Sequence, residues 1–185
     1  MIVVEGPDNS GKSTLIEWML KELPVHIIKH GRHGPPAGAW EIKTRTEIIL
    51  QKAINSSYKK GTVVDRFSLI GESIYGPILR GKDLWTEIPQ DKIRLEQVFN
   101  NLDPFIIYCR PATSTILDMS HHQLKEYDTE EHVLNVTKNQ ELIIKAYDNY
   151  FARMAPHRFY KYNYELGEES LTQLKKQLLG EYLKW

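Results

Sequence analysis

Close to the start of the chain stands the run Gly6-Pro7-Asp8-Asn9-Ser10-Gly11-Lys12-Ser13, which fits the pattern GxxxxGK[ST] of phosphate-binding loops. Before it, residues 1–5 form a β-branched apolar run that predicts a buried strand, and after it residues 14–23 have apolar positions at helical spacing. In this setting the backbone N–H groups of the loop and the helix N-terminus point at nucleotide phosphates. The sequence therefore predicts a site for ATP or GTP.

The residue types within the loop predict how a nucleotide and its metal are held. Lys12 would reach the β- and γ-phosphate oxygens, and the Ser13 hydroxyl would ligate Mg²⁺. Lys12 is also a candidate catalytic residue, because charge that develops on a transferred phosphoryl group needs a nearby cation. The other residues that we expect to bind the nucleotide are Gly6, Asn9, Ser10, Gly11 and Thr14. The expected cofactors are ATP and Mg²⁺.

The composition is that of one globular domain spanning residues 1–185. Lys plus Arg balance Asp plus Glu at 24 each, which argues against a strong overall field toward nucleic acid or membrane. The single cysteine, Cys109, ends an apolar run, so we expect a buried structural thiol in a reducing cytoplasm. Because the chain starts with a strand and has no apolar stretch of bilayer length, we expect no signal peptide and no membrane partner.

Predicted strands alternate with predicted helices along the whole chain. Beyond the loop, strands are expected at 25–29, 62–65, 105–109 and 158–162, and helices at 41–60, 70–79, 91–102, 170–183 and in a long segment from about 130 to 154. This alternation predicts an α/β fold, a three-layer sandwich with a central parallel sheet of about five strands flanked by helices. Ligands of such a sheet bind at the carboxyl ends of the strands.

A second group of polar residues directly follows the strand predicted at 62–65. Asp65 and Arg66 should emerge at the edge of the sheet where the phosphate loop also opens. The Asp65 carboxylate can hold the water shell of Mg²⁺ or accept the proton of an attacking hydroxyl, so it is a candidate catalytic residue and metal ligand. Arg66 can grip a phosphate with two N–H groups. We therefore expect both residues to act in phosphoryl transfer.

The helix that follows carries a further mixture of charges and a phenol. Glu72, Tyr75 and Arg80 lie within one helix and its exit, a combination suited to recognition of a second substrate. An ordinary amphipathic helix, with Tyr75 in the core and Arg80 in solvent, explains the same pattern equally well.

Two motifs carry a resemblance to a known family. The run from Glu5 to Thr14 resembles the first motif of thymidylate kinases, EGxDGxGKTT, and Asp65-Arg66-Phe67 with the nearby Tyr75 resembles their second motif, DR[YF]. The chain as a whole looks most like the thymidylate-kinase-like P-loop kinases of bacteriophages, with a DR…E..YGP..RG signature at residues 65–81. The resemblance implies the P-loop kinase form of the α/β sandwich and, for a phage protein, the cytoplasm of the host cell.

The resemblance also implies roles for individual residues. The aspartate that matches Asp8 contacts the 3′-hydroxyl of the deoxyribose in thymidylate kinases, and the arginine that matches Arg66 holds the acceptor phosphate. An aromatic residue often stacks on the acceptor base, for which Trp40 and Phe67 are the candidates here.

The chain departs from the family pattern in three places. It has one extra residue between Arg66 and Tyr75, and the family sequence TREPGGT is replaced by residues 29–36, where Arg32 remains as a candidate substrate-binding residue. The lid region, at about 118–131, contains no arginine. Lys125 and Arg110 are the cations that could supply the positive charge of the missing lid arginines. The lid also contains His121 and His122, which we expect to be solvated rather than to bind a metal.

Three functions remain open from the sequence. The first is ATP-dependent phosphoryl transfer to a small nucleotide acceptor, a deoxynucleoside monophosphate similar to dTMP, by in-line transfer with Mg²⁺. The second is a kinase that phosphorylates the hydroxymethyl group of a modified pyrimidine, 5-hydroxymethyluracil, in phage DNA, for which DNA is the partner. The third is a non-catalytic nucleotide-binding switch, although no guanine-specifying NKxD occurs. A homodimer is compatible with each of them.

Overall fold

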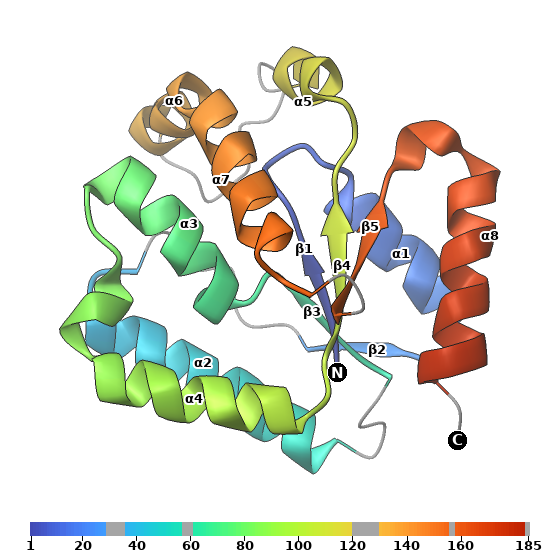
Figure 1. The fold of residues 1–185 in the computed structure, drawn as a ribbon, viewed down its shortest axis with the longest axis horizontal. Coiled ribbons are helices and arrows are strands. Elements are labelled where there is room, and N and C mark those ends of the chain that lie inside the picture. The colour runs from blue at the N-terminus through green and yellow to red at the C-terminus, as the bar shows by residue number, and fades with distance from the viewer. Residues whose placement is uncertain (29–35, 57–60, 120–129, 156–157, 184–185) are drawn as a thin grey trace.

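The protein is an α/β sandwich built on a five-stranded parallel sheet, as seen in a computed structural model that describes residues 1–28, 36–56, 61–119, 130–155 and 158–183 (Figure 1). The strands lie in the order β2-β3-β1-β4-β5, and every neighbouring pair is parallel. Their bounds are β1 Ile2–Glu5, β2 His26–Ile28, β3 Thr62–Asp65, β4 Phe105–Cys109 and β5 Phe159–Tyr162. The predicted fold class is confirmed.

Helices cover both faces of the sheet. Their bounds are α1 Lys12–Glu22, α2 Ala39–Asn55, α3 Ser68–Arg80, α4 Pro89–Asn101, α5 Thr113–Met119, α6 Glu130–Lys138, α7 Gln140–Ala152 and α8 Glu168–Gln177. Helices α1 and α8 lie on one face, and α2, α3, α4 and α7 lie on the other (Figure 1). A 3₁₀ turn, Leu84–Glu87, connects α3 to α4.

Alternation along the central strand divides the core into two layers. Ile2 and Val4 of β1 pack in the layer of α1 and α8, whereas Val3 packs in the opposite layer. All three are fully buried, as expected for a strand in the middle of a parallel sheet. Glu5, the last residue of β1, is also fully buried. A carboxylate therefore stands at the carboxyl end of an otherwise apolar strand.

The register of the sheet brings the predicted functional residues to one edge. Val4 of β1 is aligned with Asp65 of β3, and Glu5 is aligned with Tyr108 of β4. The phosphate loop after β1 and the turn after β3 consequently begin at neighbouring positions of the sheet.

Several helix boundaries differ from the prediction, and α2, for example, ends at Asn55 rather than at residue 60. The long helix expected up to residue 154 is two helices, α6 and α7, separated at Asn139. The Asn139 side-chain amide donates to the backbone oxygen of Asn135 at 2.9 Å, and such side-chain bonds compete with the helical ladder. At the C-terminus, α8 passes into a π-helical turn, Leu178–Tyr182, which ends with Tyr182 against Met1. Within the described ranges, no helix is both long and apolar enough to span a bilayer.

Candidate active site

The phosphate-binding loop joins β1 to α1 with the geometry that its glycines allow. Gly6 has φ +148°, and a Cβ there would lie 2.5 Å from the backbone oxygen of Cys109. Gly11 has φ +82°, and a Cβ there would lie 2.7 Å from the ring of Tyr164. Both positions need glycine for conformation and for space. Ser13 and Thr14, in the first turn of α1, are exposed.

Lys12 is buried beneath the loop. Its Nζ donates to the backbone oxygen of Pro7 at 2.5 Å and lies 3.4 Å from Ser10 Oγ. Burial lowers the pKa of the Lys12 ammonium to about 8, and the nearby Arg66 adds to this, while Asp8 and Asp65 oppose it. An ammonium that is poorly solvated and only partly compensated gains from the arrival of phosphate oxygens.

The turn after β3 brings Arg66 against the loop. Arg66 donates to Asp8 Oδ1 at 2.5 Å, and Tyr75 of α3 donates its hydroxyl to Asp8 Oδ2 at 3.0 Å. The guanidinium lies over the Tyr75 ring, 5.1 Å from its centroid. Burial works to lower the pKa of Arg66, but the Asp8 carboxylate outweighs it and holds that pKa above its usual value. Asp8, Arg66 and Tyr75, from three different elements, therefore form one polar cluster.

Glu5 lies below this cluster and was not identified as a site residue from the sequence. Its Oε1 accepts from the backbone N–H of Phe67 at 2.5 Å, and its Oε2 accepts from the Tyr147 hydroxyl at 3.1 Å. Burial raises the pKa of Glu5 to about 7, and these hydrogen bonds oppose the rise. One feature of the sequence could have identified Glu5 as a site residue, namely a carboxylate in an apolar strand that is predicted to be buried.

Helix α7 contacts the loop at a second point. Gln140, its first residue, is buried and donates Nε2 to the backbone oxygen of Asp8 at 3.1 Å. No pattern in the sequence singled out Gln140 or Tyr147, because an amide and a phenol on a helix are ordinary residues until the fold places them.

On the far side of the loop, side chains join the segments that follow β4 and β5. Arg110 pairs with Asp148 of α7, with Nε at 2.9 Å from Oδ1, so its charge is compensated within the protein. Glu165 accepts from the backbone N–H of Ala112 at 2.6 Å and from the hydroxyl of Thr115. These contacts fix the loops that flank the phosphate-binding loop on the side of β5.

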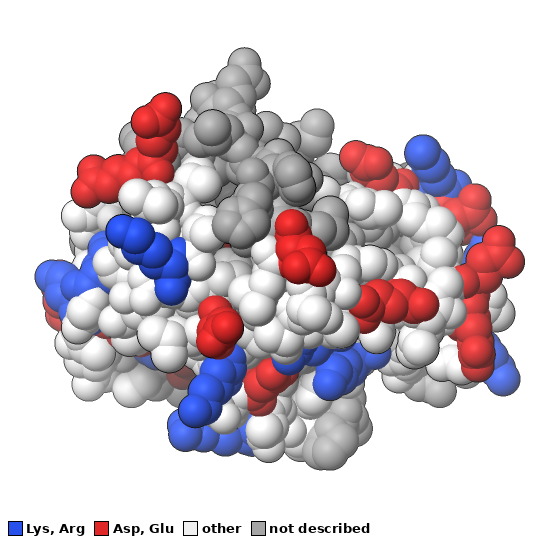
Figure 2. Space-filling view, turned by 90° about the horizontal axis from the view of Figure 1, so that it is seen from above, with Lys and Arg blue, Asp and Glu red and all other residues white. Residues whose placement is uncertain are grey.

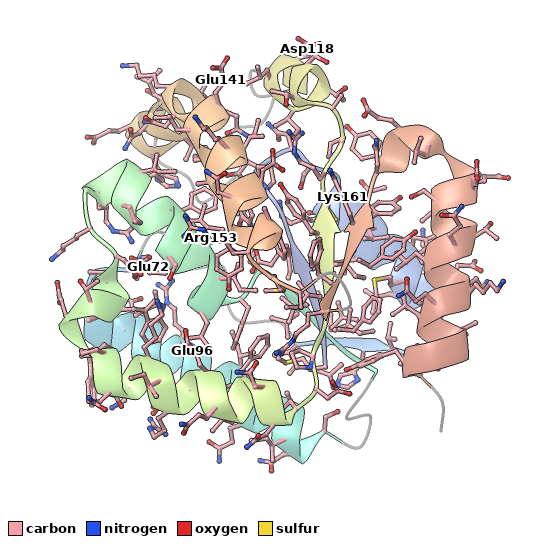
Figure 3. The ribbon with its side chains drawn as sticks, in the orientation of Figure 1. Glu72, Glu96, Asp118, Glu141, Arg153 and Lys161 are labelled. Carbon is pink, nitrogen blue, oxygen red and sulfur yellow. The ribbon has the colours of Figure 1, made fainter. Side chains whose placement is uncertain are left out.

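Several residues that were predicted to bind substrate make contacts within the protein instead. Phe67 is fully buried and packs on Phe99 with ring centroids 4.7 Å apart, so the prediction that it stacks on a base is wrong. Glu72 is 5 % exposed, pairs with Arg80 and accepts from the backbone N–H of Leu84 at 3.0 Å. Figure 3 shows Glu72 beside the link between α3 and α4, where this pair holds the chain rather than a ligand.

The remaining predicted residues divide between the surface and the undescribed segments. Trp40, in the first turn of α2, has 71 % of its surface exposed, and Lys43 lies over its ring at 4.4 Å. Arg32, His121, His122 and Lys125 lie outside the described residues, as does most of the lid region. Cys109 is fully buried, as expected, and burial raises its pKa to about 12.

The oxygen atoms of Ser13 and Asp65 fit a magnesium ion better than a transition metal. Ser13 is exposed in the first turn of α1, and Asp65 is half-buried at the end of the adjacent strand. Hydroxyl and carboxylate oxygens, with water completing the shell, are what Mg²⁺ prefers when it binds together with phosphates. The part of the chain that the structure describes holds no cluster of three or more His, Cys, Asp or Glu suited to a protein-only metal site.

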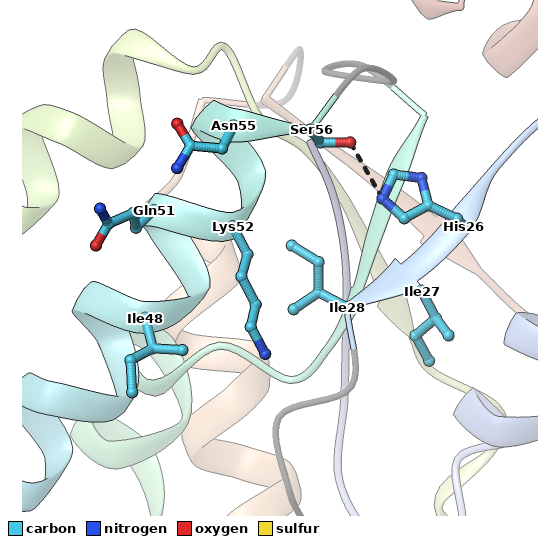
Figure 4. A pocket seen from close by; sticks show the side chains of 8 residues that line it. All are labelled: His26, Ile27, Ile28, Ile48, Gln51, Lys52, Asn55 and Ser56. Carbon is cyan, nitrogen blue, oxygen red and sulfur yellow. Dashed lines mark hydrogen bonds between the residues drawn. The ribbon is translucent and has the colours of Figure 1, made fainter.

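A pocket in the described structure lies elsewhere, at the outer edge of the sheet. It has a volume of about 580 Å³ between α2 and β2 and is lined by His26, Ile27, Ile28, Ile48, Gln51, Lys52, Asn55 and Ser56 (Figure 4). The ring of His26 lies 3.1 Å from Ser56 Oγ. None of the phosphate-loop residues lines it, so we assign the candidate active site to the loop, where backbone donors and charged groups converge.

Neither a family model nor a curated protein matches the sequence. Among solved structures, the chain is similar to the YorR protein from Bacillus subtilis in complex with phosphorylated GDP, at TM-score 0.63 and 18% identity over 95% of this chain and 96% of that chain. It is also similar to deoxyadenosine kinase from M. mycoides with bound dATP, at TM-score 0.61 and 19% identity over 96% of this chain and 98% of that chain. The likeness shows that the chain has the fold of P-loop kinases.

Proposed function

We propose that this protein transfers the γ-phosphoryl group of ATP to a deoxynucleoside monophosphate similar to dTMP. The observation that supports this most directly is the contact between Arg66 and Asp8, at 2.5 Å, which joins the turn after β3 to the phosphate loop. An anion bound by Arg66 would therefore lie beside the phosphates bound by the loop. That is the arrangement an in-line transfer between two phosphates needs.

Each charged group then has a separate task. Lys12 and the N–H groups of the loop bind the donor phosphates, and Ser13 with Asp65 would hold Mg²⁺, which neutralises charge on the β and γ oxygens. Arg66 has five N–H donors and 31% of its side chain exposed, so it can bind an acceptor phosphate while it stays paired with Asp8. Asp65 orients the attacking oxygen. Catalysis is then mainly positioning and charge neutralisation.

The acceptor could instead be a nucleoside or a base within DNA. Deoxyadenosine kinase, one of the similar structures, is named for a nucleoside acceptor, which has no phosphate for Arg66 to bind. For the 5-hydroxymethyluracil kinase, a groove for DNA would need a basic surface. On the face above the strand ends, acidic and basic side chains are interspersed, and its described part carries no continuous basic stripe (Figure 2). This distribution favours a small acceptor.

One panel of acceptors tests the proposal. Purified protein with Mg²⁺ and γ-labelled ATP is offered each dNMP, each NMP, each deoxynucleoside, and DNA with or without 5-hydroxymethyluracil. We expect label on a dNMP, with EDTA abolishing the transfer. Label on the modified DNA alone would establish the DNA kinase, and label on a deoxynucleoside alone would reassign Arg66. ATP binding without transfer to any of them would leave the nucleotide-binding switch.

A further inference from the structure

The turn that presents Arg66 has an unfavourable backbone conformation. Arg66 has φ +63°, a region in which residues other than glycine are uncommon. Such a conformation is energetically unfavourable and persists only where the surroundings hold it. Here the backbone N–H of Arg66 donates to the Val4 oxygen at 3.0 Å, and the next N–H, of Phe67, donates to Glu5 Oε1 at 2.5 Å. The last two residues of β1 thus hold both sides of the strained residue.

The carboxylate that holds this turn is itself held by α7. Glu5 is fully buried, and its second oxygen accepts from the Tyr147 hydroxyl at 3.1 Å. Burying a carboxylate is costly unless hydrogen bonds and opposite charges compensate it. Here the Phe67 N–H and the Tyr147 hydroxyl donate to it, and the charges of Arg66 and Lys12 also favour it. Its two described partners are the turn of Arg66 and a helix whose first residue, Gln140, contacts Asp8. Both members of the Asp8–Arg66 pair are therefore connected to α7.

We propose that Glu5 and Tyr147 are positioning residues that hold the Arg66 turn in the geometry needed to bind the acceptor phosphate. The proposal rests on the proposed function, because it assumes that Arg66 binds the acceptor. It assigns no contact with substrate to Glu5 or Tyr147. Their effect on the reaction passes through the backbone at Phe67.

The chain offers a matched control for Tyr147. Tyr108 is equally buried, stacks on Tyr147 at 5.9 Å and 14°, and donates its hydroxyl to Asp148 at 2.7 Å. Tyr147→Phe and Tyr108→Phe therefore each remove one hydroxyl from the same aromatic stack. Only the first removes a hydrogen bond to Glu5.

Kinetics of the two variants separate positioning from stability. We expect Tyr147→Phe to raise the acceptor KM about fivefold to tenfold, with the donor KM within about twofold, while Tyr108→Phe leaves the acceptor KM unchanged. Glu5→Gln keeps an oxygen for the Phe67 N–H, and its amide can donate to the Tyr147 hydroxyl, so its effect should be smaller than that of Tyr147→Phe, whereas Glu5→Ala should have a larger effect. Thermal melting of every variant identifies any that fails to fold, and Tyr147→Phe remains informative if the Glu5 variants do not fold.

The rate of hydrogen exchange at the Phe67 amide tests how firmly the Arg66 turn is held, and the measurement does not depend on enzymatic activity. Exchange should be faster in Tyr147→Phe than in wild type or Tyr108→Phe. Equal exchange in the two tyrosine variants, or equal acceptor KM values, would overturn the proposal. If the wild type phosphorylates no acceptor, the proposed function fails, and faster exchange in Tyr147→Phe alone would still support the hold of Glu5 and Tyr147 on the Arg66 turn.

Discussion

The two halves of the phosphate loop are held very differently. The Asp8 half is fixed from three sides, by Arg66 after β3, Tyr75 of α3 and Gln140 of α7. The Ser13 half opens to solvent at the start of α1. One half has its charges paired within the protein, and the other offers backbone and hydroxyl groups to a ligand. Under the proposed function, the acceptor side would be assembled before substrate binds, whereas the donor side would be completed by the nucleotide and its metal.

Lys12 connects the two halves, and its removal should have the largest effect. We expect Lys12→Ala to lower kcat by about a hundredfold to a thousandfold, because a preorganised charge next to the transferred phosphoryl group is lost. Stability should not fall, since the ammonium is buried with a lowered pKa in the absence of a nucleotide. Lys21→Ala, an exposed lysine on the same helix, is the control. Wild-type turnover of a normally melting Lys12→Ala would remove the donor-site assignment.

Variants of Arg66 and Asp65 test whether acceptor binding is separate from donor binding and from the chemical step. Arg66→Ala should raise the acceptor KM about a hundredfold, because it removes the phosphate contact and leaves Asp8 without its ion pair. Asp65→Asn should instead act mainly on kcat, through Mg²⁺ and the attacking oxygen. Steady-state kinetics with each substrate varied in turn make the distinction. A donor KM that rises in Arg66→Ala while the acceptor KM stays constant would move the arginine to the donor side.

Asp8 sharpens the comparison, since its carboxylate already accepts two hydrogen bonds from the protein. We expect Asp8→Ala to cost about 1.5–3 kcal/mol in kcat/KM with a monophosphate, the range for a hydrogen bond to a charged group. Part of this loss comes from breaking the ion pair between Asp8 and Arg66. An acceptor without the 3′-hydroxyl distinguishes this part from the loss of the hydrogen bond to the sugar. With the wild-type protein, removing the 3′-hydroxyl from the acceptor should lower kcat/KM by a similar amount. With Asp8→Ala, removing the 3′-hydroxyl should lower kcat/KM little further. Full additivity of the two losses would show that the carboxylate does not bind the 3′-hydroxyl.

The sequence predicted the parts of the site that depend on local pattern. The loop, the placement of Asp65 at the sheet edge where the loop opens, and the burial of Cys109 all follow from motifs and from the placement of ligands at strand ends. What it could not predict depends on contacts between distant elements. Phe67 matched a motif position, yet packing against Phe99 decided its role. The partners of Glu5 lie 62 and 142 residues away in the sequence.

The smallest effect that we predict concerns pH on the donor side. Lys12 has a pKa of about 8 in the free protein, and phosphate oxygens favour the charged form, so donor binding should raise that pKa. Below about pH 8 the lysine is already protonated and the donor Kd should be constant, whereas above it binding must take up a proton and the Kd should rise by up to about tenfold per pH unit. Calorimetric titration with a non-hydrolysable ATP analogue between about pH 7 and pH 9.5 measures this directly.

A matched variant decides whether Lys12 is the group responsible. Lys12→Met removes the ionisable group, so its donor Kd should be weaker at neutral pH and nearly independent of pH over the same interval. Arg66→Ala removes a neighbouring positive charge that lowers the Lys12 pKa, and should therefore shift the transition to higher pH. A shift in the same direction for Lys21→Ala would point to a general charge effect. A transition that persists in Lys12→Met would assign the pH dependence to another residue and would break the link between the buried lysine and the open half of the loop.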